Sequence, residues 1–569
     1  MEDLAFTEGG TVAEITALFD AMPPQTGAGM AALASAKLIS GDEAAARSLA
    51  QKVWRENRLA RNFEVGFIDR FGKLLTPEDH AARADRLLGT WFARRSPRRR
   101  RADAVRRLIP LLSPPQQKYV TARLSLYLGQ KGAEKLARAL PKEWARKPEL
   151  ARQRAQAAVR AKQYERAGRF LAKAPAGTDA PAPDGDWELR ERVAKELIEA
   201  GKAELAYTIT ATARPNDENA AKEAAFLAGW VALRKRDDAA AARPHFERML
   251  AAADGPLSTS KAHYWIGRAA PDTEQAQEAF AKGGAFLDTF HGALSRTAMM
   301  PPKRALALPL PSIPDDATVA AFKARDVIKA AVVADKAGLP RRFVRALFGT
   351  FAWRVASGGE ILLSGAVADA LGDTQVSVRA GKAGVARGHP HYVQSYPVHR
   401  LTEYDPLTER PPNELLLAIA RQESEFNTKI ISRAGARGVL QVMPITARDV
   451  CRIYRTKCDI KRLLTDEQYN TRIASAYIAT QMRVVDDNMI LTLTSYNAGP
   501  GRTRQWLRQR GAPRDGKRDP LDWTYQIPFR ETRLYVQKVL SNLQVYRARL
   551  GKETPVQVDR DLGLRASTN

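Results

Sequence analysis

Small and apolar residues at helical spacing over about the first 300 residues restrict the fold more than any other feature of this sequence. Ala, Leu, Arg and Glu recur with the period of an α-helix, and Gly, Pro or Asp interrupts them roughly every 12 to 20 residues. Four interruptions look alike, each a polar turn and then a helix rich in small residues; they begin at Ser40, Ala161, Ala200 and Arg236. Because alanine lets helices approach closely, stacked pairs can share one continuous core. The pattern predicts an α-superhelical domain of stacked helix pairs over residues 1–300.

Proline marks the next boundary. The segment from Pro301 to Pro314 carries five prolines in fourteen residues, which stops a helix and favours an extended connector. We expect a proline-rich connector and a small helical linker domain over residues 301–405, a third helical domain over residues 406–550, and a flexible tail over residues 551–569. The expected fold class is all-α.

The chain is long and strongly basic. Its 569 residues exceed what one core usually holds, and 90 Lys and Arg against 63 Asp and Glu give a formal net charge of +27. This charge favours a polyanionic or carboxylate-rich partner, such as nucleic acid, an anionic membrane or a cell-wall polymer. The densest basic run, Arg94–Arg107, lacks interleaved aromatic residues that could stack bases. A solvated helix face is therefore favoured over nucleic-acid binding.

Hydropathy and cysteine content bear on the compartment. No apolar run reaches the roughly 20 residues of a transmembrane helix, and the first residues lack the charged-then-apolar order of a signal peptide. The chain is expected to be cytoplasmic or to have had its signal removed. Cys451 and Cys458 form either a free pair or a short local disulfide, and an oxidising compartment would favour the disulfide. For His389 and His391 a surface loop is favoured over a metal site, because no Cys or acid completes a ligand set. No cofactor is expected.

The stretch from Leu415 to Pro444, LLLAIARQESEFNTKIISRAGARGVLQVMP, holds the best candidate for a catalytic group. At about 100° per residue, Leu416, Ile419 and Glu423 share one helix face, so Glu423 is expected to point toward the core. Glu425 is rotated by roughly 200° and is expected to face water. Burial raises the pKa of a carboxyl and keeps it protonated near neutrality, as a general acid requires. A buried glutamate in a structural hydrogen-bonded network is the alternative at this point.

Two later segments can line a cleft beside this helix. Gly435 and Gly438 tolerate backbone conformations and close approaches that other residues resist, so their segment can form a cleft floor. The helix before the turn from Asn497 to Gly501 is expected to carry Tyr496 in its last turn, next to a glycine-rich bend.

Three blocks in order, RQES, then S-x-x-G-A-x-G-V-L-Q-V-M-P, then SYNAGPGR, resemble the soluble lytic transglycosylases of the goose-lysozyme-like superfamily. The resemblance is sharpest over residues 411–546, and SYPVHRL, AHYWIGRA and the helical N-terminal half are similar to the longer members. It implies an α-superhelix closed into a ring, a linker domain and a lysozyme-like transglycosylase catalytic domain. These correspond to the three zones drawn above. The resemblance also implies a periplasmic protein.

The resemblance assigns roles to single positions. Glu423 matches the family's sole catalytic acid/base. Five further positions match residues that orient the carboxylate or hold the sugar: Ser432, Gln441, Met443, Tyr496 and Asn497. Among them, Tyr496 matches the tyrosine that contacts the catalytic carboxylate. Arg437 and Leu440 depart from residues that are frequent in the family, which affects the fine shape of the cleft and leaves the acid in place.

The reaction that the resemblance implies is substrate-assisted. Glu423 protonates the β-1,4 oxygen between N-acetylmuramic acid and N-acetylglucosamine in peptidoglycan, and the resulting carboxylate takes the proton of the muramic C6 hydroxyl. A 1,6-anhydro ring then forms without water. Tyr496 would orient the carboxylate by a hydrogen bond, and Ser432 would steady it or the N-acetyl group.

Peptidoglycan strands are the expected partner, with other cell-wall proteins in addition, for a chain expected to be a monomer that binds no nucleic acid. Two other functions stay open on the sequence alone. A muramidase-type hydrolase would need a water held opposite Glu423, usually by a second acid. A non-catalytic wall-binding scaffold would use the superhelix as its principal module.

Overall fold

A computed structural model describes residues 10–57, 59–89, 95–174, 185–340, 343–344, 346–347, 351, 357–389, 391–513 and 518–564. Over these residues the chain is helical, and extended pairing is limited to two isolated bridges, Ile431 with Arg437 and Arg437 with Val442. The all-α prediction is confirmed. None of the helices among these residues has the length and hydropathy needed to span a bilayer.

The chain divides into two compact units, Met1–Ala252 and Ala253–Asn569. The first unit contains a series of α-helices with two short 3-10 turns. They are α2 (Val12–Ala21), α3 (Gly27–Ile39), α4 (Glu43–Glu56), α5 (Arg61–Phe71), η2 (Gly72–Leu74), α6 (Pro77–Gly89), α7 (Arg95–Leu108), η3 (Ile109–Leu111), α8 (Pro114–Leu128), α9 (Ala133–Arg138), α10 (Lys142–Ala145), α11 (Pro148–Arg160), α12 (Tyr164–Ala172), α13 (Gly185–Glu199), α14 (Ala203–Ala211), α15 (Glu218–Lys235) and α16 (Ala239–Ala251).

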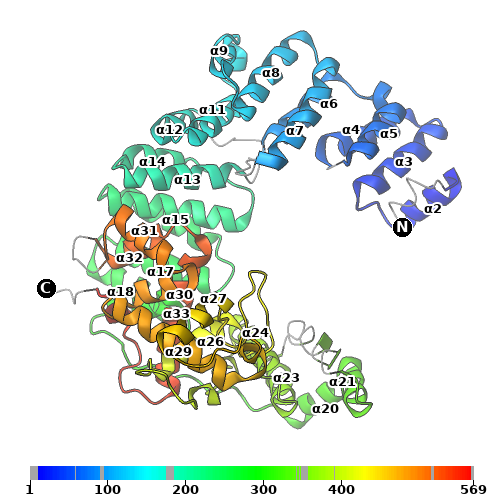
Figure 1. The fold of residues 1–569 in the computed structure, drawn as a ribbon. Helices are drawn as coiled ribbons and strands as arrows, with labels where there is room; N and C mark the ends of the chain where they lie inside the picture. The colour runs from blue at the N-terminus through cyan, green and yellow to red at the C-terminus, as the bar shows by residue number, and fades with distance from the viewer. Residues whose placement is uncertain are drawn as a thin grey trace. The chain divides into compact units, whose positions relative to one another are not determined.

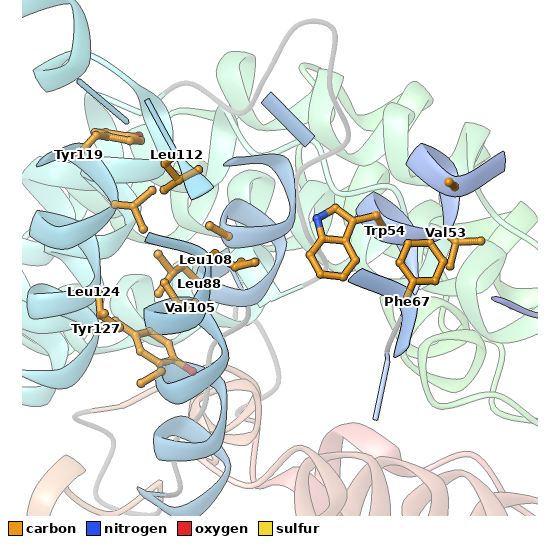
Figure 2. Packing of buried hydrophobic residues seen from close by; sticks show 14 of the residues in the cluster. Val53, Trp54, Phe67, Leu88, Val105, Leu108, Leu112, Tyr119, Leu124 and Tyr127 are labelled. Carbon is orange, nitrogen blue, oxygen red and sulfur yellow. The ribbon is translucent and has the colours of Figure 1, made fainter. Parts of the chain in front are cut away.

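Sequential helices of the first unit pack as pairs, as the repeated turns predict (Figure 1). Small residues set the separation of the helices. A Cβ at Gly229 on α15 would lie 2.6 Å from the ring of Phe246 on α16, and a Cβ at Gly168 on α12 would lie 2.8 Å from Leu205 on α14. Apolar side chains from α3 to α11 then form one continuous core, in which Trp54 stacks on Phe67 (Figure 2).

The second unit holds the remaining helices. They are α17 (Pro256–Arg268), α18 (Thr273–Gly284), α19 (Phe290–Ala298), α20 (Asp316–Ala324), α21 (Asp326–Lys336), α23 (Gly358–Ala370), α24 (Thr374–Ala386), α25 (Tyr392–Ser395), η4 (Arg400–Thr402), α26 (Asn413–Glu423), α27 (Pro444–Ile453), α28 (Arg462–Thr465), α29 (Glu467–Val484), α30 (Met489–Ala498), α31 (Pro500–Arg510), α32 (Pro520–Gln526), α33 (Arg530–Arg549) and α34 (Val558–Leu562).

Helices α17 to α19 pack with the C-terminal helices of the second unit. The Tyr525 hydroxyl on α32 accepts a hydrogen bond from Trp265 Nε1 at 3.1 Å and also contacts His291 Nε2. The division at residue 252 therefore falls before these helices, whereas the sequence analysis drew its first boundary at residue 300. The three-domain boundaries stay a prediction.

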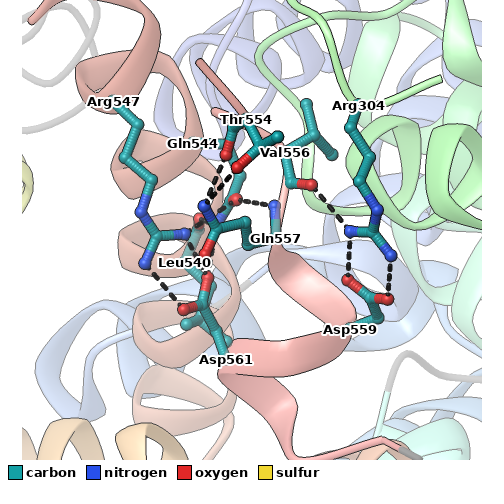
Figure 3. A network of polar contacts seen from close by, with 9 residues as sticks. All are labelled: Arg304, Leu540, Gln544, Arg547, Thr554, Val556, Gln557, Asp559 and Asp561. Atoms are coloured by element: carbon teal, nitrogen blue, oxygen red, sulfur yellow. Dashed lines mark hydrogen bonds and ion pairs between the residues drawn. The ribbon is translucent and has the colours of Figure 1, made fainter. Parts of the chain in front are cut away.

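Residues 551–564 differ from the flexible tail expected from the sequence. Val556, Val558 and Leu562 are buried, and α34 is fixed by ion pairs (Figure 3). Arg304 Nη1 and Nη2 donate to the Asp559 carboxylate at 2.9 and 2.6 Å, and Arg547 pairs with Asp561. Three apolar residues among many polar ones gave too weak a pattern to predict this packing.

Candidate active site

Glu423 is the last residue of α26, a largely buried helix of the third expected domain. Every residue from Leu415 to Arg421 is buried, so the helix is enclosed by other elements on all sides. Its last turn is fixed to α33, because Arg421 Nη1 donates to Asn542 Oδ1 at 2.7 Å and Asn542 Nδ2 donates to the Ala418 carbonyl at 3.2 Å. The backbone that presents Glu423 is therefore held by two hydrogen bonds to α33.

The surroundings of the Glu423 carboxyl favour its protonated form. Burial, the largest cause, raises its pKa, the Tyr535 hydroxyl lowers it and the nearby charge of Glu531 raises it; the net result is a pKa of about 7. The Tyr535 hydroxyl is buried and makes no regular hydrogen bond to a described residue, so its contact with Glu423 is loose in this state. Such contacts often tighten only when the substrate binds.

Tyr496 lies beside Glu423 but is engaged with another group. Burial and, after it, the Glu423 charge raise the pKa of Tyr496 well above its usual value. Its hydroxyl donates a 2.6 Å hydrogen bond to the Leu440 carbonyl, which fixes the phenol to the glycine-rich segment. Tyr496 thus lies next to the Glu423 carboxyl. The hydroxyl that lowers the pKa of this carboxyl, however, belongs to Tyr535.

The glycine-rich segment is folded against α26 and α29. Gly438 has a φ of +75°, and a Cβ there would lie 2.1 Å from the Leu463 carbonyl oxygen. The Asn470 side chain holds the same turn, donating to the Arg437 and Leu463 carbonyls at 2.9 Å and accepting from the Leu440 N–H. Gly438 is therefore required both for its backbone conformation and for this close approach.

The other predicted cleft residues all belong to this neighbourhood. Ser432 Oγ accepts the Ala436 N–H at 3.0 Å, so it closes the turn of the glycine-rich segment. Gln441, at a φ of +48°, donates from Nε2 to the Gly438 carbonyl at 2.8 Å. Met443 directly precedes α27 and is partly exposed. None of these contacts, among the described residues, is with the Glu423 carboxyl.

Asn497 joins the end of α30 to α33. Its Oδ1 accepts a 2.7 Å hydrogen bond from Thr532 Oγ1. Thr532 follows Glu531 directly, so this bond fixes the start of α33 near the catalytic candidate.

Glu425 does not face water as the helical rotation predicted. Helix α26 ends at Glu423, and Glu425 has a φ of +52°, so helical geometry no longer applies to it. Its carboxylate pairs with Arg379 Nε at 2.6 Å and Lys382 Nζ at 2.8 Å on α24. Burial raises the pKa of Glu425, but these two cations outweigh burial and hold the pKa below its usual value. Glu425 is thus a charged anchor, distinct from the protonatable Glu423.

Cys451 is buried, Cys458 is exposed, and both are free thiols. Burial and then a contact with Cys458 raise the pKa of Cys451 to about 11, so the two sulfur atoms are neighbours. The choice between a free pair and a local disulfide stays open, as it was on the sequence. Within the described ranges, no group of three or more His, Cys, Asp or Glu side chains is arranged to hold a metal ion.

Two residues of the site, Glu531 and Tyr535, were not predicted from the sequence. Both lie outside the three motif blocks. Glu531 and Tyr535 are four positions apart and therefore share one face of α33. A polar, aromatic face on an otherwise buried helix was the pattern that could have revealed them.

Comparison with known protein families matches residues 405–518 to the transglycosylase SLT domain and residues 526–555 to the soluble lytic transglycosylase helical domain. The soluble lytic murein transglycosylase of Escherichia coli (strain K12) is 34% identical over 155 residues, 27% of this chain and 23% of that protein. The chain thus matches about a quarter of the length of this curated relative.

Two solved structures are similar over most of the chain. An inactive mutant of the lytic transglycosylase Slt from Pseudomonas aeruginosa has a TM-score of 0.68 at 20% identity, covering 93% of this chain and 82% of that one. The 70 kDa soluble lytic transglycosylase of Escherichia coli has a TM-score of 0.62 at 21% identity, covering 98% and 85%. At these identities the likeness shows the fold: a helical chain that carries an SLT domain toward its C-terminus.

Proposed function

We propose that this chain, which carries a transglycosylase SLT domain, is a lytic transglycosylase that cleaves the β-1,4 bond between N-acetylmuramic acid and N-acetylglucosamine in peptidoglycan. The observation that carries the proposal is the Glu423 carboxyl within that domain, with its pKa raised to about 7. A carboxyl with such a pKa can hold a proton at neutral pH and can later take one back. One residue can then serve as acid and afterwards as base.

In the proposed reaction, protonated Glu423 gives its proton to the glycosidic oxygen as the bond to the muramic C1 breaks. The muramic N-acetyl group stabilises the cationic centre. The Glu423 carboxylate then takes the proton of the muramic C6 hydroxyl, whose oxygen bonds to C1 and closes a 1,6-anhydro ring. The sugar's own hydroxyl reacts at an effective concentration that bulk water cannot match.

The surrounding residues have supporting roles in this proposal. Tyr535 would tighten its contact with the Glu423 carboxylate once the proton has left, and Tyr496 would hold the glycine-rich segment in place through its bond to the Leu440 carbonyl. Ser432, Gln441, Met443 and Asn497 would shape the part of the cleft that receives the sugar. Ser432 and Gln441 would act through the backbone of the segment, because their side chains bond to it.

The presence of Glu531 near Glu423 supports a second candidate function, that of a hydrolase. Ordinary glycosidases use two carboxylates, and Glu531 is near enough to act on the pKa of Glu423. An ionised Glu531 could activate a water for attack at C1. The two candidates differ in one product: the hydrolase leaves a reducing muramic end, whereas the transglycosylase leaves the anhydro form.

The substrate sets the expected location and partners. Peptidoglycan lies in the periplasm, so we infer that the protein works there. Its formal net charge of +27 would attract the carboxylates of muramic acid and stem peptides by weak, salt-sensitive contacts. Binding to other cell-wall proteins and a monomeric state remain expectations.

Replacing Glu423 by Gln tests the proposal directly. The amide keeps the size of the side chain but cannot donate and retake the proton, so release of muropeptides from purified wall should fall at least about a hundredfold. Glu425→Gln is the matched control, because it changes the same chemical group two positions away. Full release by Glu423→Gln, with circular dichroism and melting temperature unchanged, would rule out Glu423 as the acid.

A further inference from the structure

Phe529 is a large apolar residue on the surface, two positions before Glu531 in the chain. It directly precedes α33, and 45% of its surface is exposed. Single exposed apolar side chains are common on proteins, so exposure alone assigns Phe529 no role. Its neighbours and its place beside the candidate active site are what distinguish it.

Helix α31 holds the Phe529 ring in a defined position. The buried Trp506 packs edge to face with it, with ring centroids 5.1 Å apart and ring planes at 88°. The guanidinium carbon of Arg502 lies 5.6 Å from the centre of the Phe529 ring. Arg502 Nη1 also donates a 3.0 Å hydrogen bond to Gln505 Oε1 on the same helix. An exposed ring and a cation are thus held side by side.

The positive charge beside this ring is not neutralised by an ion pair. Helix α31 contains four arginines and no Asp or Glu. Arg502 and Arg530 are exposed, and neither forms an ion pair with a described residue. Arg462 of the same unit, by contrast, pairs with Asp466 at 2.6 Å. Glu531 adds one negative charge to this stretch, which the two arginines leave net positive, so it favours a ligand that carries carboxylates.

The same elements carry residues of the candidate active site. A 2.7 Å hydrogen bond from Thr532 Oγ1 to Asn497 Oδ1 joins the beginning of α33 to the end of α30, and α31 follows α30 after Gly499 alone. Phe529 and Arg502 therefore lie on the two segments that this bond holds together. A polymeric ligand of the Glu423 site is long enough to reach both.

We propose that Phe529 and Arg502 form an outer subsite for the peptidoglycan glycan strand, with the ring against the apolar face of a sugar and Arg502 on a carboxylate. This inference rests on the proposed function, because it takes the strand as the ligand. A sugar that covers the exposed part of the ring removes apolar surface from water, which favours binding. The Arg502 guanidinium would donate paired hydrogen bonds to the carboxylate of muramic acid or of a stem peptide.

Binding to the full chain carrying Glu423→Gln tests the subsite, because this parent variant should not cleave its ligand. Calorimetric titration would compare neutral oligosaccharides of N-acetylglucosamine with soluble glycan strands that carry stem peptides. Phe529→Ala should weaken binding of both ligands about tenfold, because the apolar contact with the sugar is lost. Arg502→Gln should weaken binding of the strands about tenfold and leave binding of the neutral oligosaccharides unchanged.

Two matched controls lie on the same helices. Leu534→Ala removes another exposed apolar side chain of α33, and Arg508→Gln removes an exposed arginine of α31 that forms no ion pair with a described residue. Both should bind the two ligands as the parent does. Phe529→Ala loses a contact with Trp506, so circular dichroism and the melting temperature check its fold. If it does not fold, the comparison of Arg502→Gln with Arg508→Gln decides alone.

Several results would overturn the proposal. They are no binding of either ligand by the parent, strand binding by folded Phe529→Ala at the parent's affinity, and equal losses in Phe529→Ala and Leu534→Ala. Equal losses of strand affinity in Arg502→Gln and Arg508→Gln would also overturn it, because they would show a general attraction of the basic helix for polyanions.

Strands stripped of their stem peptides identify the carboxylate. If Arg502→Gln weakens binding of stripped strands, the carboxylate belongs to muramic acid, and if it weakens binding only of strands with peptides, the carboxylate belongs to the peptide. None of these titrations requires bond cleavage. A hydrolase product or an inactive wild type would therefore refute the proposed reaction and leave the subsite standing.

Discussion

Glu423 can serve as a proton donor near neutrality because opposing effects set its pKa. Burial and the Glu531 charge raise it, and Tyr535 lowers it. The protonated fraction falls as the pH rises through about 7, so kcat/KM for wall cleavage should decline on the alkaline side of that value.

Replacing Glu531 and replacing Tyr535 should shift this alkaline decline in opposite directions along the pH axis. Glu531→Gln removes a charge that raises the pKa of Glu423, so the alkaline decline should shift to lower pH. Tyr535→Phe removes the group that lowers the pKa, so the decline should shift to higher pH. Profiles of kcat/KM from pH 5 to pH 9, a range of about two units either side of the expected midpoint, give the answer. Shifts in the same direction would contradict the assigned environment.

At the level of single residues, the sequence predicted the inward direction of the Glu423 side chain better than the groups that would surround it. Glu423 follows from an apolar helical pattern that ends on a carboxyl. Glu425 was placed wrongly because the pattern cannot show that α26 stops at Glu423 and that Glu425 itself takes a positive φ. Tyr535 lies more than a hundred residues from Glu423 along the chain, and only tertiary packing brings the two together.

At the level of elements, the glycine-rich segment is the part of the site most sensitive to substitution. Gly438→Ala would force a Cβ onto the Leu463 carbonyl in a left-handed backbone conformation, which should cost about 2 to 5 kcal/mol of unfolding free energy. Activity should fall with it, because Leu440 would no longer be placed to accept from Tyr496. Chemical denaturation with wall-cleavage assays measures both.

Gly435→Ala is the control within the same segment. Gly435 has a φ of +92°, yet a Cβ there meets nothing within 4 Å, so only the backbone conformation is strained. The expected cost is about 1 to 2 kcal/mol. Equal costs for the two variants would mean that the close approach at Gly438 does not matter.

Glycine spacing predicted that this segment would need unusual backbone conformations, and both glycines have positive φ. It could not predict which groups the segment would meet. Asn470, which holds the turn, comes from α29, and its role depends on how that helix packs. Likewise the sequence placed Tyr496 at a helix end but could not show that its hydroxyl would reach a backbone carbonyl.

At the level of the whole molecule, residues 551–564 bind to the proline-rich connector through Arg304. Burial raises the pKa of Asp559, but the hydrogen bonds and charge of Arg304 outweigh burial and hold the pKa below its usual value. The stabilisation is therefore present above the unfolded pKa of about 4 and is lost as the pH falls through the lower folded value.

Asp559→Asn should lower the unfolding free energy at pH 7 by about 1 to 3 kcal/mol, and the difference from the wild type should shrink as the solution is acidified. Asp449→Asn removes an exposed ion pair with Arg452 and should change stability by about 0.5 kcal/mol or less. Denaturant melts across the acid range compare the two. A constant difference at all pH values would show that the Asp559 charge is not what holds α34.

The helical architecture was predictable because helix pairs repeat a local pattern many times. Close packing at Gly229 and Gly168 follows from the same small residues that suggested stacked helices. The order in residues 551–564 was not predictable, because few apolar residues mark it and its ion pair with Arg304 joins positions more than two hundred residues apart.

Cleavage of purified peptidoglycan in oxygen-18 water tests the central claim most directly. If Glu423 first protonates the glycosidic oxygen and then activates the muramic C6 hydroxyl, no water enters the product. Mass spectrometry should then find 1,6-anhydro muropeptides without label. Muropeptides with oxygen-18 at a reducing muramic end would show that water is the nucleophile, and would favour the hydrolase instead.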